Sequence, residues 1–80
     1  MDVELAVRET LREVTGSEEV VTNPDVPLFE SGLLDSMNVV QVLAGLSARL
    51  DVEIPLSAFD QQNWDTPEKM ATEVRAVLNL

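Results

Sequence analysis

Three stretches of the chain repeat apolar residues at intervals of three and four, which is the period of an amphipathic α-helix. The stripes are Val3, Ala6, Val7, Leu11 and Val14; Val39, Val42, Leu43, Leu46 and Leu50; and Met70, Ala71, Val74, Val77 and Leu78. Strand-like alternation nowhere exceeds a few residues, and stripes of this kind are buried against one another. We therefore expect an all-α fold, a four-helix bundle with a long first loop and a short third helix.

Residues at the ends of the first and last stripes have the chemistry of helix caps. Asp2 can cap a first helix that runs to about Thr15, and Gly16 can end that helix in a left-handed conformation. Thr66 is the expected cap of the last helix, with Pro67 at its first position.

Similar cap residues and turn signals indicate the elements between the first and last helices. Asp35 is the expected cap of a second helix over residues 36–50, and Ser57 can cap a short helical turn through Phe59. Residues 16–35 form a long connection with turn and extended signals at its two prolines. Its most apolar members should lie beneath the helices and close the core: Leu28, Phe29, Leu33 and Leu34. A structured loop of this length in a small domain often has a function.

Missing residue types exclude several classes of chemistry. The 80 residues fit one domain, residues 1–80, with a modest core. Without cysteine the chain has no disulfide and no thiolate metal site, and without histidine it has no Ser-His-Asp arrangement. Its acidic pairs do not match a calcium loop. We therefore expect no metal site, and no enzyme activity from the chain itself.

The formal net charge of −10, from 15 acidic and five basic residues, determines the kind of partner. Such a chain is repelled by nucleic acids and anionic membranes and is attracted to basic protein surfaces. No apolar run approaches the ~20 residues of a membrane span, and the acidic start is unlike a signal peptide. We expect a soluble cytoplasmic protein that neither binds nucleic acid nor inserts into membranes.

One hydroxyl stands at the junction between the long connection and the second helix. Ser36 follows the cap residue Asp35 at the positive end of a helix dipole, and we expect it to face solvent. The first amides of a helix are unpaired and favour anionic groups, which suits a side chain that is modified through a phosphate. The alternative is that Asp35 and Ser36 are ordinary cap residues, since both types are favoured there.

The chain resembles acyl carrier proteins around their attachment motif, which corresponds to Leu28-Phe29-Glu30-Ser31-Gly32-Leu33-Leu34-Asp35-Ser36-Met37. The resemblance extends over nearly the whole chain. Within the family it is closest to the D-alanyl carrier proteins, on three further stretches. These are Asn23-Pro24-Asp25-Val26, Val52-Glu53-Ile54-Pro55-Leu56-Ser57-Ala58-Phe59-Asp60 and Asn63-Trp64-Asp65-Thr66-Pro67.

The resemblance implies a right-handed four-helix carrier fold in which Ser36 bears 4'-phosphopantetheine and Asp35 is the flanking motif residue. A phosphopantetheinyl transferase would attach this arm from coenzyme A. An adenylating ligase would load an amino acid or another small acyl group on its thiol, for a downstream acyltransferase or biosynthetic enzyme. The chain would catalyse nothing, and the cofactor would supply the sulfur that the sequence lacks. The cargo stays open here: D-alanine for cell-wall acylation, or an amino acid for a specialised pathway.

The second helix departs from the acidic pattern of many fatty-acid carriers. Its first turns carry no carboxylate, and a strip of apolar and polar residues follows Ser36: Met37, Val40, Gln41 and Ala44. We expect this docking strip to contact partner enzymes in a way that depends little on salt. The alternative is that Met37 and Val40 only cover the edge of the core. We expect a monomer, with a weak dimer through the strip as the alternative.

A second function class also fits the composition. The chain could be a non-catalytic acidic helical interaction module, such as a mimic of nucleic acid. A mimic spreads its carboxylates over one continuous face, whereas the second helix here is nearly uncharged. The sequence therefore favours the carrier.

Overall fold

The computed structural model describes residues 2–79, and the regular structure within that range is helical. Its elements are α1 (Val3–Thr15), α2 (Glu19–Thr22), α3 (Val39–Leu50), the 3₁₀ helix η1 (Leu56–Ala58) and α4 (Pro67–Leu78). Three long helices, with a long first connection and a short helix before the last, confirm the predicted all-α class. No helix in this part of the chain is long and apolar enough to cross a bilayer.

The caps of the first and last helices are those predicted. The Asp2 carboxylate accepts from the Leu5 N–H at 3.2 Å, and Gly16 ends α1 with a φ of 72°. Thr66 accepts from the Lys69 N–H at 3.1 Å and precedes Pro67 at the start of α4. These ends are confirmed because cap chemistry is local and needs no tertiary partner.

The start of α3 differs from the prediction. The helix begins at Val39, whereas we expected it to begin at Ser36, and residues 36–38 form a turn instead. Asp35 still opens the helical hydrogen bonding, because its carbonyl accepts from the Val39 N–H at 3.1 Å.

A one-turn helix in the first connection was not foreseen. The Glu19 N–H donates to the Ser17 hydroxyl at 3.2 Å, which begins α2. This turn places Val20 in the core with no exposed surface. A single turn leaves no apolar periodicity, so the sequence pattern could not reveal it.

The predicted cap of the short third helix is wrong. Ser57 lies inside η1 and is exposed. Pro55 holds extended backbone immediately before, so the turn begins at Leu56, one residue earlier than a Ser57 cap allows.

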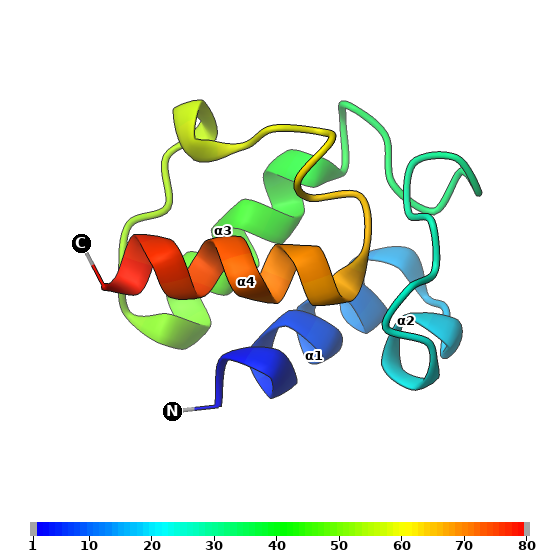
Figure 1. Ribbon diagram of the computed structural model, residues 1–80, viewed down its shortest axis with the longest axis horizontal. Coiled ribbons are helices and arrows are strands. Elements are labelled where there is room, and N and C mark those ends of the chain that lie inside the picture. The colour runs from blue at the N-terminus through cyan, green and yellow to red at the C-terminus, as the bar shows by residue number, and fades with distance from the viewer. Residues whose placement is uncertain (1, 80) are drawn as a thin grey trace.

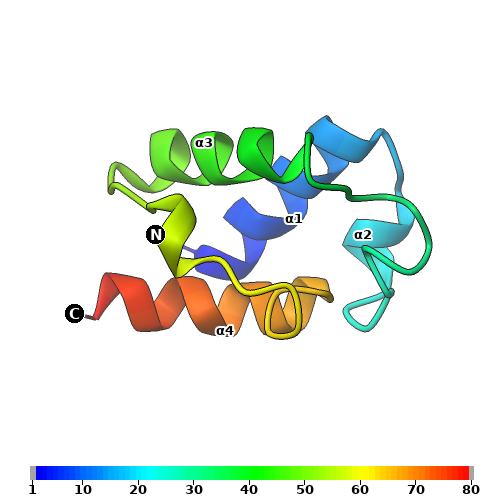
Figure 2. The ribbon, with the colours of Figure 1, turned by 90° about the horizontal axis from the view of Figure 1, so that it is seen from above.

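Helix α1 is central to the bundle. It packs against both α3 and α4, and Figure 2 shows it between them, with α3 and α4 running in the same direction. The first connection lies at the end of the bundle where α3 and α4 begin (Figures 1 and 2). Side chains from all four α-helices and from both long connections form one buried cluster.

Backbone hydrogen bonds join the two connections. The Leu28 N–H donates to the Asp65 carbonyl at 2.7 Å, and the Glu68 N–H donates to the Pro24 carbonyl at 3.1 Å. The first connection is therefore held at both of these points by the segment that leads into α4.

An aromatic chain reinforces this junction. The ring centroids of Phe29 and Phe59 lie 5.6 Å apart in an edge-on arrangement, and those of Phe59 and Trp64 lie 5.8 Å apart. Trp64 is fully buried and belongs to the core cluster. Aromatic contacts of this geometry add to the free energy of burial.

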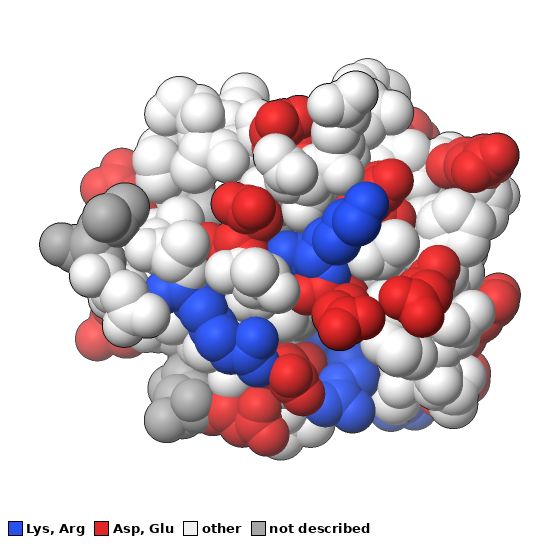
Figure 3. Space-filling model, in the orientation of Figure 1, with Lys and Arg blue, Asp and Glu red and all other residues white. Residues whose placement is uncertain are grey.

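Surface ion pairs use every basic side chain. The pairs are Arg8 with Glu4, Arg12 with Glu18, Arg49 with Glu9 and Glu13, Lys69 with Asp65, and Arg75 with Glu4. Figure 3 shows blue side chains bordered by red ones, and further red groups that stand apart. Exposed pairs of this kind contribute little to stability. The excess of carboxylates therefore leaves a negative surface that favours basic partners.

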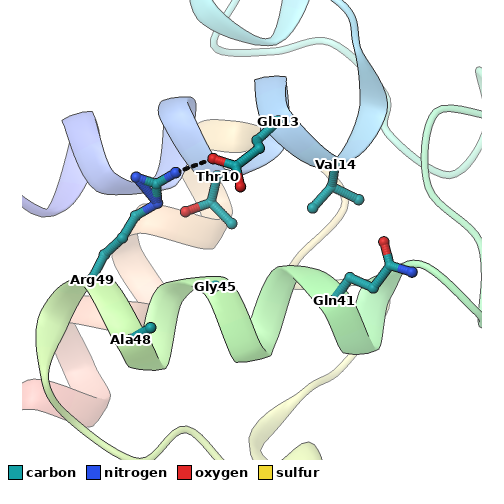
Figure 4. Close-up of a pocket in the computed structure, with 7 residues that line it drawn as sticks. All are labelled: Thr10, Glu13, Val14, Gln41, Gly45, Ala48 and Arg49. Atoms are coloured by element: carbon teal, nitrogen blue, oxygen red, sulfur yellow. Dashed lines mark hydrogen bonds and ion pairs between the residues drawn. The ribbon is translucent and has the colours of Figure 1, made fainter.

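The helices α1 and α3 approach each other closely at a glycine. Figure 4 shows Thr10 of α1 facing the α3 backbone at Gly45. A Cβ on Gly45 would lie 2.8 Å from the Thr10 Cγ2. Thr10 is buried and β-branched, and its hydroxyl donates to the Ala6 carbonyl at 2.7 Å, so it has little freedom to move. Glycine at this position is therefore a packing requirement.

We expect Gly45→Ala to destabilise the protein although alanine is the better helix former. Overpacking a core contact costs about 1–3 kcal/mol, against ~1 kcal/mol gained from helix propensity. In a Thr10→Ser background, which lacks the Cγ2 methyl, the same change should be neutral or stabilising. Urea denaturation of the four proteins in this cycle measures the effect, and an equal loss in both backgrounds would contradict the contact.

Candidate functional site

Ser36 is exposed on the turn between the first connection and α3. Before it, Leu34 is buried and its N–H donates to the Leu28 carbonyl at 2.9 Å. Gly32 reverses the chain between these two residues with a φ of 83°, a conformation that favours glycine. After it, the buried Val39 begins α3. The Ser36 side chain is thus presented by a backbone that is anchored on both sides.

The Asp35 carboxylate caps this turn, but Asp35 is not the cap residue of α3 that we predicted: because α3 begins at Val39, its cap position falls at Asn38, whose side chain makes no capping bond to the helix. The Asp35 Oδ1 accepts from the Met37 N–H at 2.8 Å and from the Asn38 N–H at 2.9 Å. The expectation that these first amides are unpaired and available to a phosphate is therefore wrong. They are already paired with the Asp35 carboxylate and are not free to bind a phosphate on Ser36.

The same two hydrogen bonds change the acidity of the cap. Donation from the Asn38 and Met37 amides holds the pKa of Asp35 below its ordinary value of 3.8 and outweighs the opposing effect of desolvation. Because the folded-state pKa is lowered, the cap contributes stability above the unfolded-state pKa. That contribution is lost as the pH falls through the folded-state pKa.

We expect Asp35→Asn to be less stable than the parent at neutral pH, and the difference to shrink as the pH falls below about 4. Asparagine keeps an oxygen that accepts from the two amides but cannot become charged. Urea denaturation of both proteins at a series of pH values gives the difference directly. A gap that is independent of pH would contradict the assignment of the cap to the ionised carboxylate.

Asn38 is part of this site, and the sequence analysis did not single it out. Its Oδ1 accepts from the Asp35 N–H at 2.7 Å, and its Nδ2 donates to the Leu33 carbonyl at 3.1 Å. The reciprocal bonds between Asp35 and Asn38 have the form of a capping box, in which the first and fourth residues satisfy each other's amides. The spacing Asp-x-x-Asn was the signal that could have identified it.

The predicted docking strip is exposed along α3 and the turn before it. Met37 is 81% exposed and Val40 is 51% exposed, and Gln41 and Ala44 are also exposed. At this exposure Met37 does not cover the core, which disfavours the alternative for that residue. The structure therefore places Ser36, its cap and the strip next to one another at one end of α3.

Comparison with known proteins identifies one family and several relatives. A family model described as the phosphopantetheine attachment site matches residues 6–74, from α1 into α4. The chain is 46% identical over 71 residues to the D-alanyl carrier protein of Listeria innocua, covering 89% of this chain and 91% of that protein. Identity to the D-alanyl carrier protein of Lacticaseibacillus casei is 50% over 68 residues, covering 85% and 84%. For that of Enterococcus faecalis it is 40% over 77 residues, covering 96% and 99%.

Proposed function

The chain belongs to the phosphopantetheine-attachment family of carrier proteins, and we propose that it bears its 4'-phosphopantetheine arm on the Ser36 hydroxyl. The observation that supports this residue is its placement: it is exposed on a turn that the Asp35 cap and the buried Leu34 hold in position. The carrier contributes the hydroxyl and its presentation to attachment, because a transferase can bring coenzyme A and a metal ion.

In the attachment reaction Ser36 Oγ is the nucleophile. It attacks the phosphorus of coenzyme A that lies next to the pantetheine. An Oγ–P bond forms, and the P–O bond to adenosine 3',5'-bisphosphate breaks. The hydroxyl proton passes to a base of the transferase or to solvent, since the chain has no histidine and Asp35 is engaged with two amides. When bound, the arm supplies a terminal thiol that holds an acyl group as a thioester.

The cargo that we propose is D-alanine, for acylation of a cell-wall polymer. The names of the three relatives support this cargo, and their similarity extends over most of each chain. The interior of the protein supports a small cargo as well. Trp64 is fully buried and in contact with Phe59, so side chains already occupy the space beneath the connections.

We propose that residues 1–80 act as one carrier domain that catalyses no step itself. Its partners are a phosphopantetheinyl transferase, an adenylating ligase that loads the amino acid and a downstream acyltransferase. Tethering the cargo to a small domain raises its effective concentration at each partner's active site. We place these reactions in the cytoplasm, where coenzyme A and ATP are available.

The cargo is tested by loading the modified protein with a D-alanine-specific adenylating ligase, ATP and either D-alanine or L-alanine. We expect the mass of one alanyl group to be added only with D-alanine and to be removed by hydroxylamine, which cleaves thioesters. The carrier from Listeria innocua is the positive control for the ligase. If that carrier is loaded and this one is not, or if another amino acid is preferred with its own ligase, the cargo proposal fails.

The docking strip is tested at its most exposed residue. We expect Met37→Glu to lower the kcat/KM of loading by about tenfold or more, because a charge must be desolvated in an apolar contact. Folding should be unaffected, since Met37 is 81% exposed. The matched control is Leu5→Glu on α1, where the parent residue is 49% exposed and lies outside the strip. If Met37→Glu and the parent are loaded at the same rate, the docking strip is not part of the interface with the ligase.

A further inference from the structure

The side chain of Asn38 closes the turn that contains Ser36. It accepts from the Asp35 N–H at 2.7 Å on one side and donates to the Leu33 carbonyl at 3.1 Å on the other. Its own N–H donates to the Asp35 carboxylate at 2.9 Å. A single residue of the turn before α3 is therefore bonded to two residues of the connection that precedes Ser36.

These bonds hold the backbone of the segment from Leu33 to Ser36. Without the Asn38 side chain, the Asp35 N–H and the Leu33 carbonyl lose their partners in the protein. The Asp35 carboxylate would still cap the turn through the Met37 and Asn38 amides, and the buried Leu34 would still anchor the connection. We therefore expect the change to act on the backbone that carries Ser36 and the fold to be retained.

We propose that Asn38 is a positioning residue that holds the Ser36 hydroxyl in the orientation needed for phosphopantetheine attachment. This inference rests on the proposed role of Ser36. An ordered turn presents its nucleophile without an additional entropic cost on binding, whereas a loosened turn must be ordered by the transferase. Asn38 makes no covalent contribution and does not contact the reacting phosphorus in this account.

The electrostatics of the turn specify which replacements preserve this role. Glutamine keeps an amide that can both accept from the Asp35 N–H and donate to the Leu33 carbonyl, on a chain longer by one methylene. Alanine keeps neither group. Aspartate is excluded as a conservative variant, because it would place a second carboxylate beside Asp35 and face the Leu33 carbonyl with an acceptor.

The test compares Asn38→Ala, Asn38→Gln and the parent as full-length apo-proteins, each at a temperature where thermal unfolding shows it to be fully folded. Asn63→Ala is the matched control, since the side-chain amide of Asn63 donates to the Asp60 carboxylate at 3.0 Å in the second connection. The rate of modification is followed by intact mass with coenzyme A and a broad-specificity transferase. Hydrogen exchange of the Asp35 amide, measured by NMR, reports the bond itself.

We expect Asn38→Ala to lower kcat/KM about three- to tenfold, as the loss of one exposed and one partly buried hydrogen bond allows, and to speed exchange of the Asp35 amide. Asn38→Gln should recover both quantities in large part, and Asn63→Ala should match the parent. Modification of Asn38→Ala at the parental rate overturns the inference. It is also overturned if Asn38→Gln restores the slow exchange of the Asp35 amide but does not restore the rate of modification. If the parent itself gains no phosphopantetheine, the proposed function fails and this inference fails with it.

Discussion

Replacing Ser36 by alanine should abolish phosphopantetheine attachment completely and leave the apo-protein as stable as the parent. The side chain is exposed, and the turn is capped by the neighbouring Asp35, so folding does not require the hydroxyl. Attachment does require it, because no other atom at this position can form the bond to phosphorus. Intact mass after incubation with coenzyme A and a transferase, together with thermal unfolding of the apo-protein, measures both effects.

Ser31 provides the matched control for this change. It is an exposed serine of the same motif, and its hydroxyl donates to the Leu28 carbonyl at 3.3 Å. We expect Ser31→Ala to be modified like the parent. Modification of Ser36→Ala, or loss of modification in Ser31→Ala alone, would assign the arm to another residue.

Trp64→Ala should cause the largest loss of stability of any substitution considered. The indole is fully buried and contacts Phe59 of the same connection, which in turn contacts Phe29 of the first connection. Truncating a buried tryptophan costs about 3–5 kcal/mol. A domain of this length has only about 4–12 kcal/mol in total, so the melting temperature should fall by about 15 °C or more. Thermal unfolding followed by circular dichroism tests this without using the missing fluorophore.

Trp64→Phe separates the ring from its N–H. Nε1 of Trp64 is buried and has no hydrogen-bond partner among residues 2–79, so phenylalanine removes an unsatisfied donor while it keeps an aromatic ring. We expect this variant to lie much closer to the parent than alanine does. A melting temperature for Trp64→Ala equal to that of the parent would show that the residue does not hold the connections in place.

Features determined by residues close together in sequence could be predicted from the sequence. The caps at Asp2, Gly16 and Thr66 belong to this class, and all three are confirmed. The predicted buried stripe of α3 is also confirmed, because its apolar residues follow the helical period closely. The exposed turn at Ser36 followed from the position of its cap.

The remaining features depend on tertiary partners that a sequence pattern does not contain. Thr10 lies on the apolar face of α1 as a buried polar residue, which is tolerated there because its hydroxyl donates to the Ala6 carbonyl. Gly45 is required only because Thr10 lies against it. Val20 reaches the core through a single turn that carries no periodic signal.

At the candidate site, the sequence pattern did not reveal the hydrogen-bond partners of the Asp35 side chain. The sequence pattern predicts a cap at Asp35 but does not show which amides its carboxylate accepts from, so the first amides were expected to be free. In the structure that carboxylate accepts from the Met37 and Asn38 amides, and the side-chain oxygen of Asn38 accepts from the Asp35 N–H. The turn is therefore ordered by its own side chains, before any partner or cofactor arrives.

Mapping the attachment on the unaltered chain tests the central claim, that Ser36 on this ordered turn bears the arm. The apo-protein is incubated with coenzyme A and a broad-specificity transferase, digested, and the peptide that contains Ser31 and Ser36 is fragmented by tandem mass spectrometry. The account predicts one phosphopantetheine per chain, located on Ser36. A folded chain that gains no mass, or one that carries the arm on Ser31 or elsewhere, would contradict it.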